Sequence, residues 1–320
     1  MSSQDPDSQK NLLLAVVLSM LVMLGWQYFY AGPQLLWLSA IVGGTLFGFG
    51  MVLASGCGSK SLVRLGAGNL KSLVVLLVLG VSAFATLRGV SAVLRVNSVD
   101  RIDLVLASGQ DLPSLLAARL GVATPLLAVV LGTLVALLLV AWVLRHAQGR
   151  TREVWLGGVG LGAVIAALWG VSGVMGHLAE DPGTLEEVFL ATNSKRMESL
   201  SMVAPVAYTL DWLMFFSDRT KLLTLGIVSM AGVVAGSAAV ALASRDFRWE
   251  GFANIEDMVN HIVGGLLMGV GGITALGCTV GQGLSGVSTL SLGSFLAVGA
   301  IIAGAVLALR YQVWRLERSA

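Results

Sequence analysis

Charged residues, cysteine and proline are all scarce in this sequence. Of its 320 residues 12% are charged, the net charge at pH 7 is +2, and there are 2 cysteines and 6 prolines. Such a balance, without a basic stripe, argues against nucleic acid as a partner. Two cysteines cannot build a disulfide framework, and these two do not form a CxxC pair. A P-loop and a cluster of metal ligands are also missing from the sequence, so we expect no nucleotide, metal or other cofactor.

Long apolar segments are what the sequence has in quantity. Hydrophobic residues make up 56% of it, and it contains 40 glycines. Soluble domains are about 45–50% apolar and about 25% charged, so a soluble fold would have to expose much of this apolar surface. Small residues let transmembrane helices approach one another closely. The composition therefore predicts an all-α integral membrane protein that crosses the membrane several times.

Eight apolar segments are each long enough to cross about 30 Å of hydrocarbon as a helix. The first, Asn11–Tyr30, ends in aromatic residues that are typical of a membrane interface. It is long for a signal peptide and no small-residue cleavage site follows, so we expect a retained anchor over residues 1–33. The other seven run about Leu35–Ser55, Leu70–Val90, Ala123–Leu144, Val154–Val174, Leu222–Ala243, Met258–Leu276 and Thr289–Leu309.

A further apolar stretch, Leu200–Phe216, is shorter and is interrupted by Pro205 and Asp211. We expect it to be re-entrant, because only then do the main clusters of Lys and Arg all fall on the cytoplasmic side. Both ends of the chain are then cytoplasmic. The residues in these clusters are Lys60, Arg64, Lys71, Arg145, Arg150, Arg152, Arg310, Arg315 and Arg318.

Two parts of the chain share one motif at a constant separation. Ile41–Gly44 has the same letters as Ile262–Gly265, and the same step along the chain, here called the repeat step, places Gly56-Cys57 on Gly277-Cys278. The expected copies span about residues 35–90 and 256–311, and the expected topology runs them in opposite directions. An inverted repeat with glycine-interrupted helices is typical of transporters whose site lies near the midplane.

Both cysteines lie where a helix is expected to break. A buried cysteine in a membrane helix is most often a small hydrophobic residue, and glycines often serve close packing, so a structural role is one alternative. Broken backbone at membrane depth, however, is tolerated only where it is buried in protein or lines a polar cavity. For the hydroxyl and amide side chains, helix capping is the alternative. We expect no catalytic residue, and a substrate-binding site made by Cys57, Cys278, Gly56, Gly58, Ser59, Gly277, Thr279, Gln282 and Ser285.

At these residues the chain resembles the YeeE/YedE family of sulfur-compound transporters. The likeness extends from about Trp37 to Trp314, and its most specific part is GCTVGQGLSGVSTLSLGS at residues 277–294. Other similar stretches are RWEGF at 248–252, NH at 260–261, GGLLMG at 264–269, TLEE at 184–187 and ATNS at 191–194. The first segment, Lys10–Tyr30, instead resembles the anchor of YidC-type membrane insertases, and we infer no insertase activity from it.

The resemblance implies transport of thiosulfate, passed between conserved cysteines at a central constriction of a cell inner membrane protein. Cys57 and Cys278 match two of those positions. The family's thiosulfate carriers have a third cysteine that this chain lacks, so another sulfur species or a selenium analogue is an alternative substrate. The implied partners are the small sulfur anion, the lipid bilayer and a cytoplasmic protein that accepts sulfur.

Two other functions remain open from the sequence alone. The two thiols could cycle between dithiol and disulfide in a membrane-embedded redox protein, although the missing CxxC spacing argues against it. The insertase-like anchor suggests a scaffold or assembly factor. We favour a transporter without enzyme activity, with an anchor at 1–33, a transporter domain at 34–314 and a cytoplasmic tail at 315–320.

Overall fold

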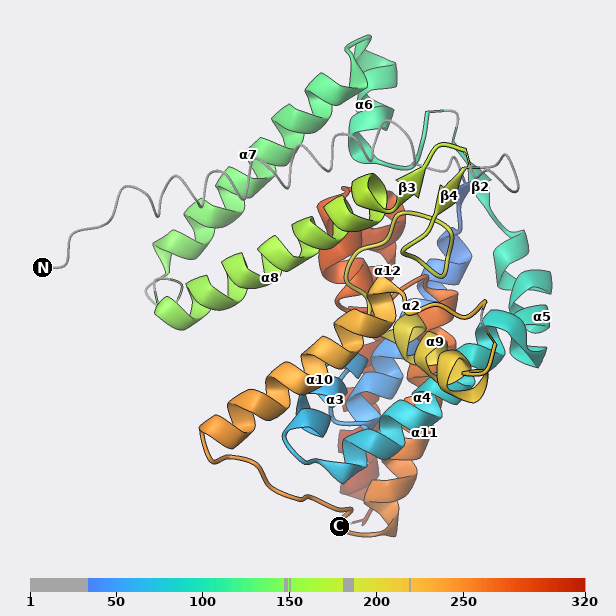
Figure 1. The fold of residues 1–320 in the computed structure, drawn as a ribbon, viewed down its shortest axis with the longest axis vertical. Helices are drawn as coiled ribbons and strands as arrows, with labels where there is room; N and C mark the ends of the chain where they lie inside the picture. The colour runs from blue at the N-terminus through green and yellow to red at the C-terminus, as the bar shows by residue number, and fades with distance from the viewer. Residues whose placement is uncertain are drawn as a thin grey trace, which may run out of the picture. The chain divides into compact units, whose positions relative to one another are not determined.

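The computed structural model describes residues 34–106, 108–146, 149, 151–180, 187–218 and 220–319. Over these ranges it is built almost entirely from helices, which confirms the predicted all-α class (Figure 1). The long helices are α2 (Trp37–Leu53), α4 (Leu70–Arg88), α7 (Thr124–Arg145), α8 (Arg152–Gly170), α10 (Leu225–Ala243), α11 (Ile255–Thr274) and α12 (Leu292–Ser319).

The remaining elements are short. The helices among them are α3 (Gly58–Gly66), α5 (Val90–Asn97), α6 (Leu112–Leu120) and α9 (Val203–Met214), with the 3-10 turn η1 (Val99–Arg101) and the π-turns η3 (Val171–Met175) and η4 (Gly281–Gly286). The strands are β1 (Gln34–Leu35), β2 (Leu104–Val105), β3 (His177–Leu178) and β4 (Val188–Phe189), of which β3 and β4 pair antiparallel.

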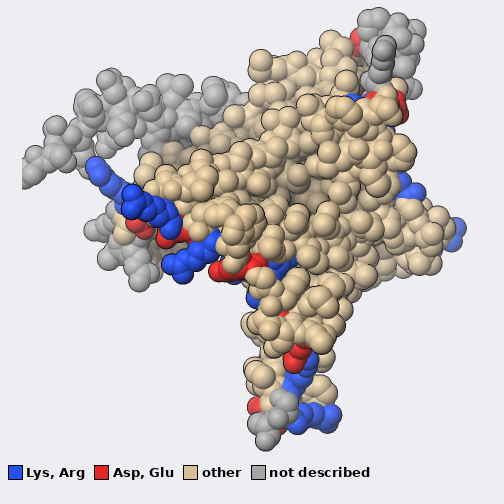
Figure 2. Space-filling view, turned by 60° about the horizontal axis from the view of Figure 1, so that its bottom comes forward, with Lys and Arg blue, Asp and Glu red and all other residues tan. Residues whose placement is uncertain are grey.

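Six helical segments among the described residues are long and apolar enough to cross a membrane. They are Trp37–Gly66, which contains α2 and α3, and Leu70–Arg88, Thr124–Arg145, Arg152–Met175, Leu225–Ala243 and Leu292–Arg318. Figure 2 shows broad areas of the drawn face without any charged side chain, and the Lys, Arg, Asp and Glu residues gather in a few groups between them. An uncharged surface of this kind suits contact with lipid, because a charged side chain at the bilayer centre is costly.

The expected spans can now be compared with these helices. Each of the seven segments predicted after residue 34 forms a helix, but Met258–Leu276, which forms most of α11, is not among the six candidates. The predicted first span, Asn11–Tyr30, lies outside the described residues. Leu200–Phe216 forms α9, whose 12 residues extend about 18 Å, less than the hydrocarbon thickness. The count of eight spans and the re-entrant path of Leu200–Phe216 stay predictions.

The described residues form two compact units, and all the predicted site residues lie in the second. Unit 1 contains Leu106–Leu200 and Ser288–Leu292, and unit 2 contains Leu35–Val105, Ser201–Val287 and Gly293–Ala320. In unit 1, the Ser172 hydroxyl in the π-turn η3 donates to the Glu198 carbonyl at 2.6 Å, which ties the segment before α9 to that turn. The predicted division into anchor, transporter domain and tail stays a prediction.

In unit 2, α11 packs against both α2 and α4, and glycines make the approach close. A Cβ atom at Gly43 of α2 would lie 2.3 Å from the Ala275 nitrogen, and one at Gly264 of α11 would lie 2.7 Å from the Ala54 nitrogen. Under the repeat step Gly43 corresponds to Gly264 and Ala54 corresponds to Ala275. Each copy therefore presents the same glycine to the same alanine of the other.

The same exchange of contacts includes α4 and α12. A Cβ atom at Gly48 would lie 2.0 Å from the Ile301 carbonyl oxygen of α12, and one at its counterpart Gly269 would lie 2.5 Å from the Leu79 carbonyl oxygen of α4. The separation of Leu79 and Ile301 exceeds the repeat step by a single residue. Reciprocal contacts are what two units related by a twofold axis make. The opposite direction of the two copies in the membrane stays a prediction.

Candidate functional site

Both α2 and α11 end in the same hydrogen-bonded motif. Ser55 has φ 57° and its counterpart Leu276 has φ 59°, so each lies in the left-handed region. The Gly56 N–H then donates to the Met51 carbonyl at 2.8 Å, and the Gly277 N–H donates to the Gly272 carbonyl at 2.8 Å. This pattern is a Schellman motif, which stops a helix and satisfies its last carbonyls. It turns the chain sharply just before each cysteine.

Neither break uses glycine at the left-handed position, although glycine is the residue that adopts this conformation most easily. A left-handed residue with a side chain costs about 1–2 kcal/mol. The close packing of α2 on α11 holds both ends in place, so the fold offsets this cost. The helix breaks expected before Cys57 and Cys278 are therefore present at the same point of both copies.

After the breaks the two copies differ by a single residue. The first continues into α3, while the second forms the π-turn η4, in which the Ser285 N–H donates to the Val280 carbonyl. Before this turn, equivalent residues of the two copies are separated along the chain by the repeat step. After it, they are separated by one residue more, because a π-turn holds more residues than an α-helical turn. π-turns occur frequently at functional sites.

Cys57 brings the two copies together. It is the N-cap residue of α3, its side chain is half-buried, and its sulfur lies 3.0 Å from the Ser59 hydroxyl. The Thr279 hydroxyl, on the residue after Cys278, also lies close to this thiol. Three of the predicted site residues therefore meet at one sulfur atom, and one of them belongs to the second copy.

Cys278 is completely buried. Its sulfur accepts the Gly281 N–H at 3.4 Å, where the π-turn begins. Ser201, which lies just before α9, reaches the same place: a Cβ atom at Gly281 would lie 2.9 Å from the Ser201 hydroxyl oxygen and 3.8 Å from the Cys278 sulfur. Cys57 and Cys278 are both free thiols.

Gln282 bridges three segments of unit 2. Its amide nitrogen donates to the Ala275 carbonyl at the end of α11 at 2.7 Å, and its amide oxygen accepts the Ser294 hydroxyl of α12 at 2.6 Å. Both ends of the amide are thus bound to the protein. In this arrangement Gln282 holds the break in α11 and the start of α12 together, and its predicted contact with substrate stays a prediction.

The other predicted site residues line the two breaks. A Cβ atom at Gly56 would contact the Lys60 side chain, one at Gly58 would lie 3.5 Å from Leu79, and one at Gly277 would lie 3.0 Å from Gln282. Ser285 is buried within the π-turn. Every predicted residue therefore lies at or beside one of the two breaks, but only Cys57, Ser59 and Thr279 meet directly around a thiol.

A polar cavity of about 460 Å³ lies next to the first break. The Arg64 guanidinium, which lines it, donates to the Ser55 carbonyl at 3.0 Å. Lys71 pairs with Asp257 at 2.8 Å, and Asp257 also lies 3.0 Å from the His261 ring. The charged residues in its lining are Arg64, Lys71, Arg248, Asp246, Glu250 and Asp257.

Sequence reasoning missed Ser201 and Ser294. Ser201 lies far ahead of Cys278 in the chain. Only the packing of the segment just before α9 beside the π-turn brings the two residues together. Ser294 lies inside the family-like stretch 277–294, but its role depends on the return of α12 past Gln282. No local spacing in the sequence marks either contact.

The comparisons with known proteins agree with one another. The family described as Sulphur transport matches residues 2–307. "Thiosulfate transporter TsuA" of Escherichia coli (strain K12) is 28% identical over 253 residues, which are 78% of this chain and 67% of that protein. "Thiosulfate transporter TsuA" of Spirochaeta thermophila (strain ATCC 700085 / DSM 6578 / Z-1203) is 27% identical over 268 residues, 80% of this chain and 72% of that protein. The family match includes both helix breaks and both cysteines.

Proposed function

The chain belongs to the sulphur transport family, and we propose that it carries thiosulfate, or a closely related small sulfur anion, across the cell inner membrane through the two thiols. The resemblance predicted from residues 277–294 is thereby confirmed at the level of the family, and the chain is a multi-pass membrane transporter of sulfur compounds. The substrate, the membrane and the role of the cysteines are the parts that we propose.

Binding of thiosulfate requires two kinds of protein group. Its terminal sulfur is soft and polarizable, whereas its sulfonate oxygens accept strong hydrogen bonds. A thiol is a weak donor with a polarizable sulfur, and it suits the first end. Hydroxyl groups and backbone N–H groups at helix starts suit the second. The meeting of Cys57, Ser59 and Thr279 supports the proposal most directly, because it places a thiol and two hydroxyls within reach of one small anion.

The two thiols differ in access. Cys57 is half-buried, while Cys278 is fully enclosed beside Gly281 and Ser201. We propose that the anion meets one thiol at a time, and that the π-turn must move before Cys278 is reached. Thr279 is well placed for this transfer, since it follows Cys278 in the chain and its hydroxyl lies close to Cys57.

The polar cavity beside Ser55 offers a way out of the site. Arg64 and Arg248 line it, and neither is in an ion pair with a described residue. A guanidinium binds oxyanions well. The nearby carboxylates weaken this attraction, which suits a station that an anion must also leave. We propose that the substrate passes through this cavity to the cytoplasm, where a sulfur-accepting protein takes it up.

Uptake by cells that carry this protein as their sole importer tests the proposal. Thiosulfate, sulfite, sulfate and selenosulfate are compared at equal membrane abundance of the protein. We expect thiosulfate to be taken up best, because sulfate lacks the soft sulfur. Cys278→Ala should abolish uptake and Cys278→Ser should retain little, since a hydroxyl is a hard donor of similar size. The same changes at Cys57 should act in the same direction, less strongly.

Membrane abundance, measured for each variant, separates a loss of transport from a loss of folding. Cys→Ala removes one small group, so each variant should keep its membrane abundance, at a cost of about 1–2 kcal/mol. Wild-type uptake by the double variant Cys57→Ala, Cys278→Ala would refute the thiol relay and return both residues to a packing role. Equal uptake of sulfate and thiosulfate would refute the proposed substrate.

A further inference from the structure

The carboxyl-terminal end of α12 extends beyond what a membrane span needs. Its 28 residues measure about 42 Å, against about 30 Å of hydrocarbon. The last turns contain Tyr311 and Trp314 together with Arg310, Arg315 and Arg318. Tyrosine and tryptophan favour the membrane–water interface, and arginine near a helix end reaches toward the head groups. This part of α12 therefore lies at the level of the lipid head groups.

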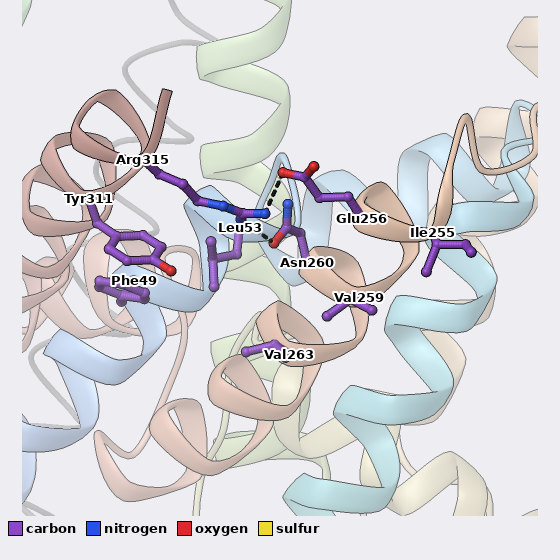
Figure 3. A pocket seen from close by; sticks show the side chains of 9 residues that line it. All are labelled: Phe49, Leu53, Ile255, Glu256, Val259, Asn260, Val263, Tyr311 and Arg315. Carbon is purple, nitrogen blue, oxygen red and sulfur yellow. Dashed lines mark hydrogen bonds and ion pairs between the residues drawn. The ribbon is translucent and has the colours of Figure 1, made fainter. Parts of the chain in front are cut away.

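An open groove of about 840 Å³ lies beside it, lined by residues of α2, α11 and α12. Its walls are mainly apolar, with Phe49 and Leu53 on α2 and Val259 and Val263 on α11. Figure 3 shows these side chains around one space, with Arg315, Glu256 and Asn260 gathered at one end of it and Tyr311 beside Phe49. The groove thus has apolar walls and a polar end, which match the apolar chains and the polar head group of a phospholipid.

The polar end carries one charge of each sign. Arg315 pairs with Glu256 at 2.5 Å and donates to the Asn260 amide oxygen at 3.3 Å. Both charged side chains remain open to the surroundings, with 39% of Arg315 and 63% of Glu256 exposed. A guanidinium has five N–H donors, and these two contacts use only part of them. The Tyr311 hydroxyl lies in the same groove without a hydrogen-bond partner among the described residues.

We propose that this groove binds a phospholipid with a zwitterionic, amine-bearing head group, of the phosphatidylethanolamine type. The phosphate lies against Arg315 and Tyr311, and the ammonium lies against the open oxygen of Glu256. Charge decides between the lipid classes. An anionic head group would satisfy Arg315 but would be repelled by Glu256, and a quaternary ammonium has no N–H to donate to that carboxylate. An amine-bearing zwitterion matches both charges.

The site is independent of the sulfur pathway. None of its residues belongs to the candidate substrate site, although Leu53 lies within the Schellman motif that stops α2. A lipid bound here contacts the ends of α2, α11 and α12 at once. We therefore expect it to stabilise the packing around the first break.

Lipid retention by the purified full-length protein tests the proposal. The protein is exchanged from mild detergent into mixed micelles of phosphatidylethanolamine, phosphatidylcholine and phosphatidylglycerol in equal amounts, and retained lipid is counted by native mass spectrometry. We expect phosphatidylethanolamine to be retained preferentially. Arg315→Gln and Glu256→Gln should each lower its retention about tenfold, the factor expected for one lost charge-assisted hydrogen bond.

Two further variants make the result decisive. Arg318→Gln is the matched control, because Arg318 lies over the Trp314 ring on the same helix end and does not line the groove. It should retain lipid like the wild type. Val259→Trp should fill the apolar part and displace the lipid while Arg315 and Glu256 stay paired. Equal retention of the three lipids, undiminished retention in Val259→Trp, or a lipid-free dimer seated on this face would overturn the proposal.

Discussion

Replacing Gly48 by alanine tests the close helix packing that positions both breaks. A Cβ atom there would lie 2.0 Å from the Ile301 carbonyl oxygen and 2.9 Å from the Ala305 nitrogen, both backbone atoms of α12. Ordinary van der Waals contact begins at 3.4 Å. The helices α2 and α12 would therefore have to move apart by most of the difference between 3.4 Å and the 2.0 Å contact with the Ile301 oxygen. No side-chain rotation can relieve a clash with backbone.

The expected cost follows from two opposing effects. Overpacking in a tight interior costs about 1–3 kcal/mol, and a rigid backbone obstacle belongs at the upper end. Glycine to alanine in a helix returns about 1 kcal/mol of helix propensity. Gly48→Ala should therefore destabilise the protein by about 2 kcal/mol. Gly269→Ala should cost less, because its backbone obstacle, the Leu79 carbonyl oxygen, lies at 2.5 Å and the nearer Ser82 hydroxyl can rotate away.

Tryptophan fluorescence during unfolding in SDS, added to protein in mild detergent, provides the measurement. Gly232→Ala is the control, because Gly232 lies within α10 and a Cβ atom there would contact nothing within 4 Å. We expect the order of stability Gly232→Ala, wild type, Gly269→Ala, Gly48→Ala. A Gly48→Ala protein as stable as Gly232→Ala would refute the argument that α2 and α12 touch through backbone.

Two further predictions concern single polar side chains. Gln282→Leu should lower stability by about 2 kcal/mol or more, because it leaves the Ala275 carbonyl and the buried Ser294 hydroxyl without their partner. Unfolding in SDS measures this cost, and unchanged stability would contradict the bridging role; the KM of the folded fraction for thiosulfate, measured alongside, rises if Gln282 also contacts substrate. Burial raises the pKa of Glu198, so this residue favours the folded state while it is protonated and loses that contribution as the pH rises from its ordinary value through the raised one. Glu198→Gln should therefore raise the melting temperature at pH 7 and not below the ordinary pKa of glutamate, and a pH-independent difference would contradict the assigned cause.

The helices and their breaks were predictable because they depend on local patterns. Apolar length determined where the seven helices after residue 34 lie. Most helix starts and ends differ from the expected ones by only a few residues, but α12 continues to Ser319, well beyond the expected end at Leu309. The two breaks followed from the repeated Gly56-Cys57 and Gly277-Cys278 motifs. The family was predictable for the same reason, since residues 277–294 form one continuous signature.

The detailed site was not predictable, because it depends on contacts between distant segments. No residue near Cys57 in the sequence indicates that the Thr279 hydroxyl, which belongs to the other copy, lies close to its thiol. Gln282 has the hydrogen-bonding groups of a substrate ligand, yet in the fold both are bound to Ala275 and Ser294. The π-turn was also hidden, because the motif that revealed the repeat ends before the separation of equivalent residues changes.

The extra residue in the π-turn η4 makes the two copies of the repeat unequal in conformational energy. In a perfectly symmetric pair, exchanging the conformations of the halves would turn the transporter to face the opposite side at no net cost. Here the second half cannot adopt the backbone of α3 residue for residue, since η4 must place one residue more between the same two helices. The predicted opposite direction of the two copies in the membrane then implies that the inward-facing and outward-facing forms are unequally populated at rest, even before any substrate or ion gradient acts on them.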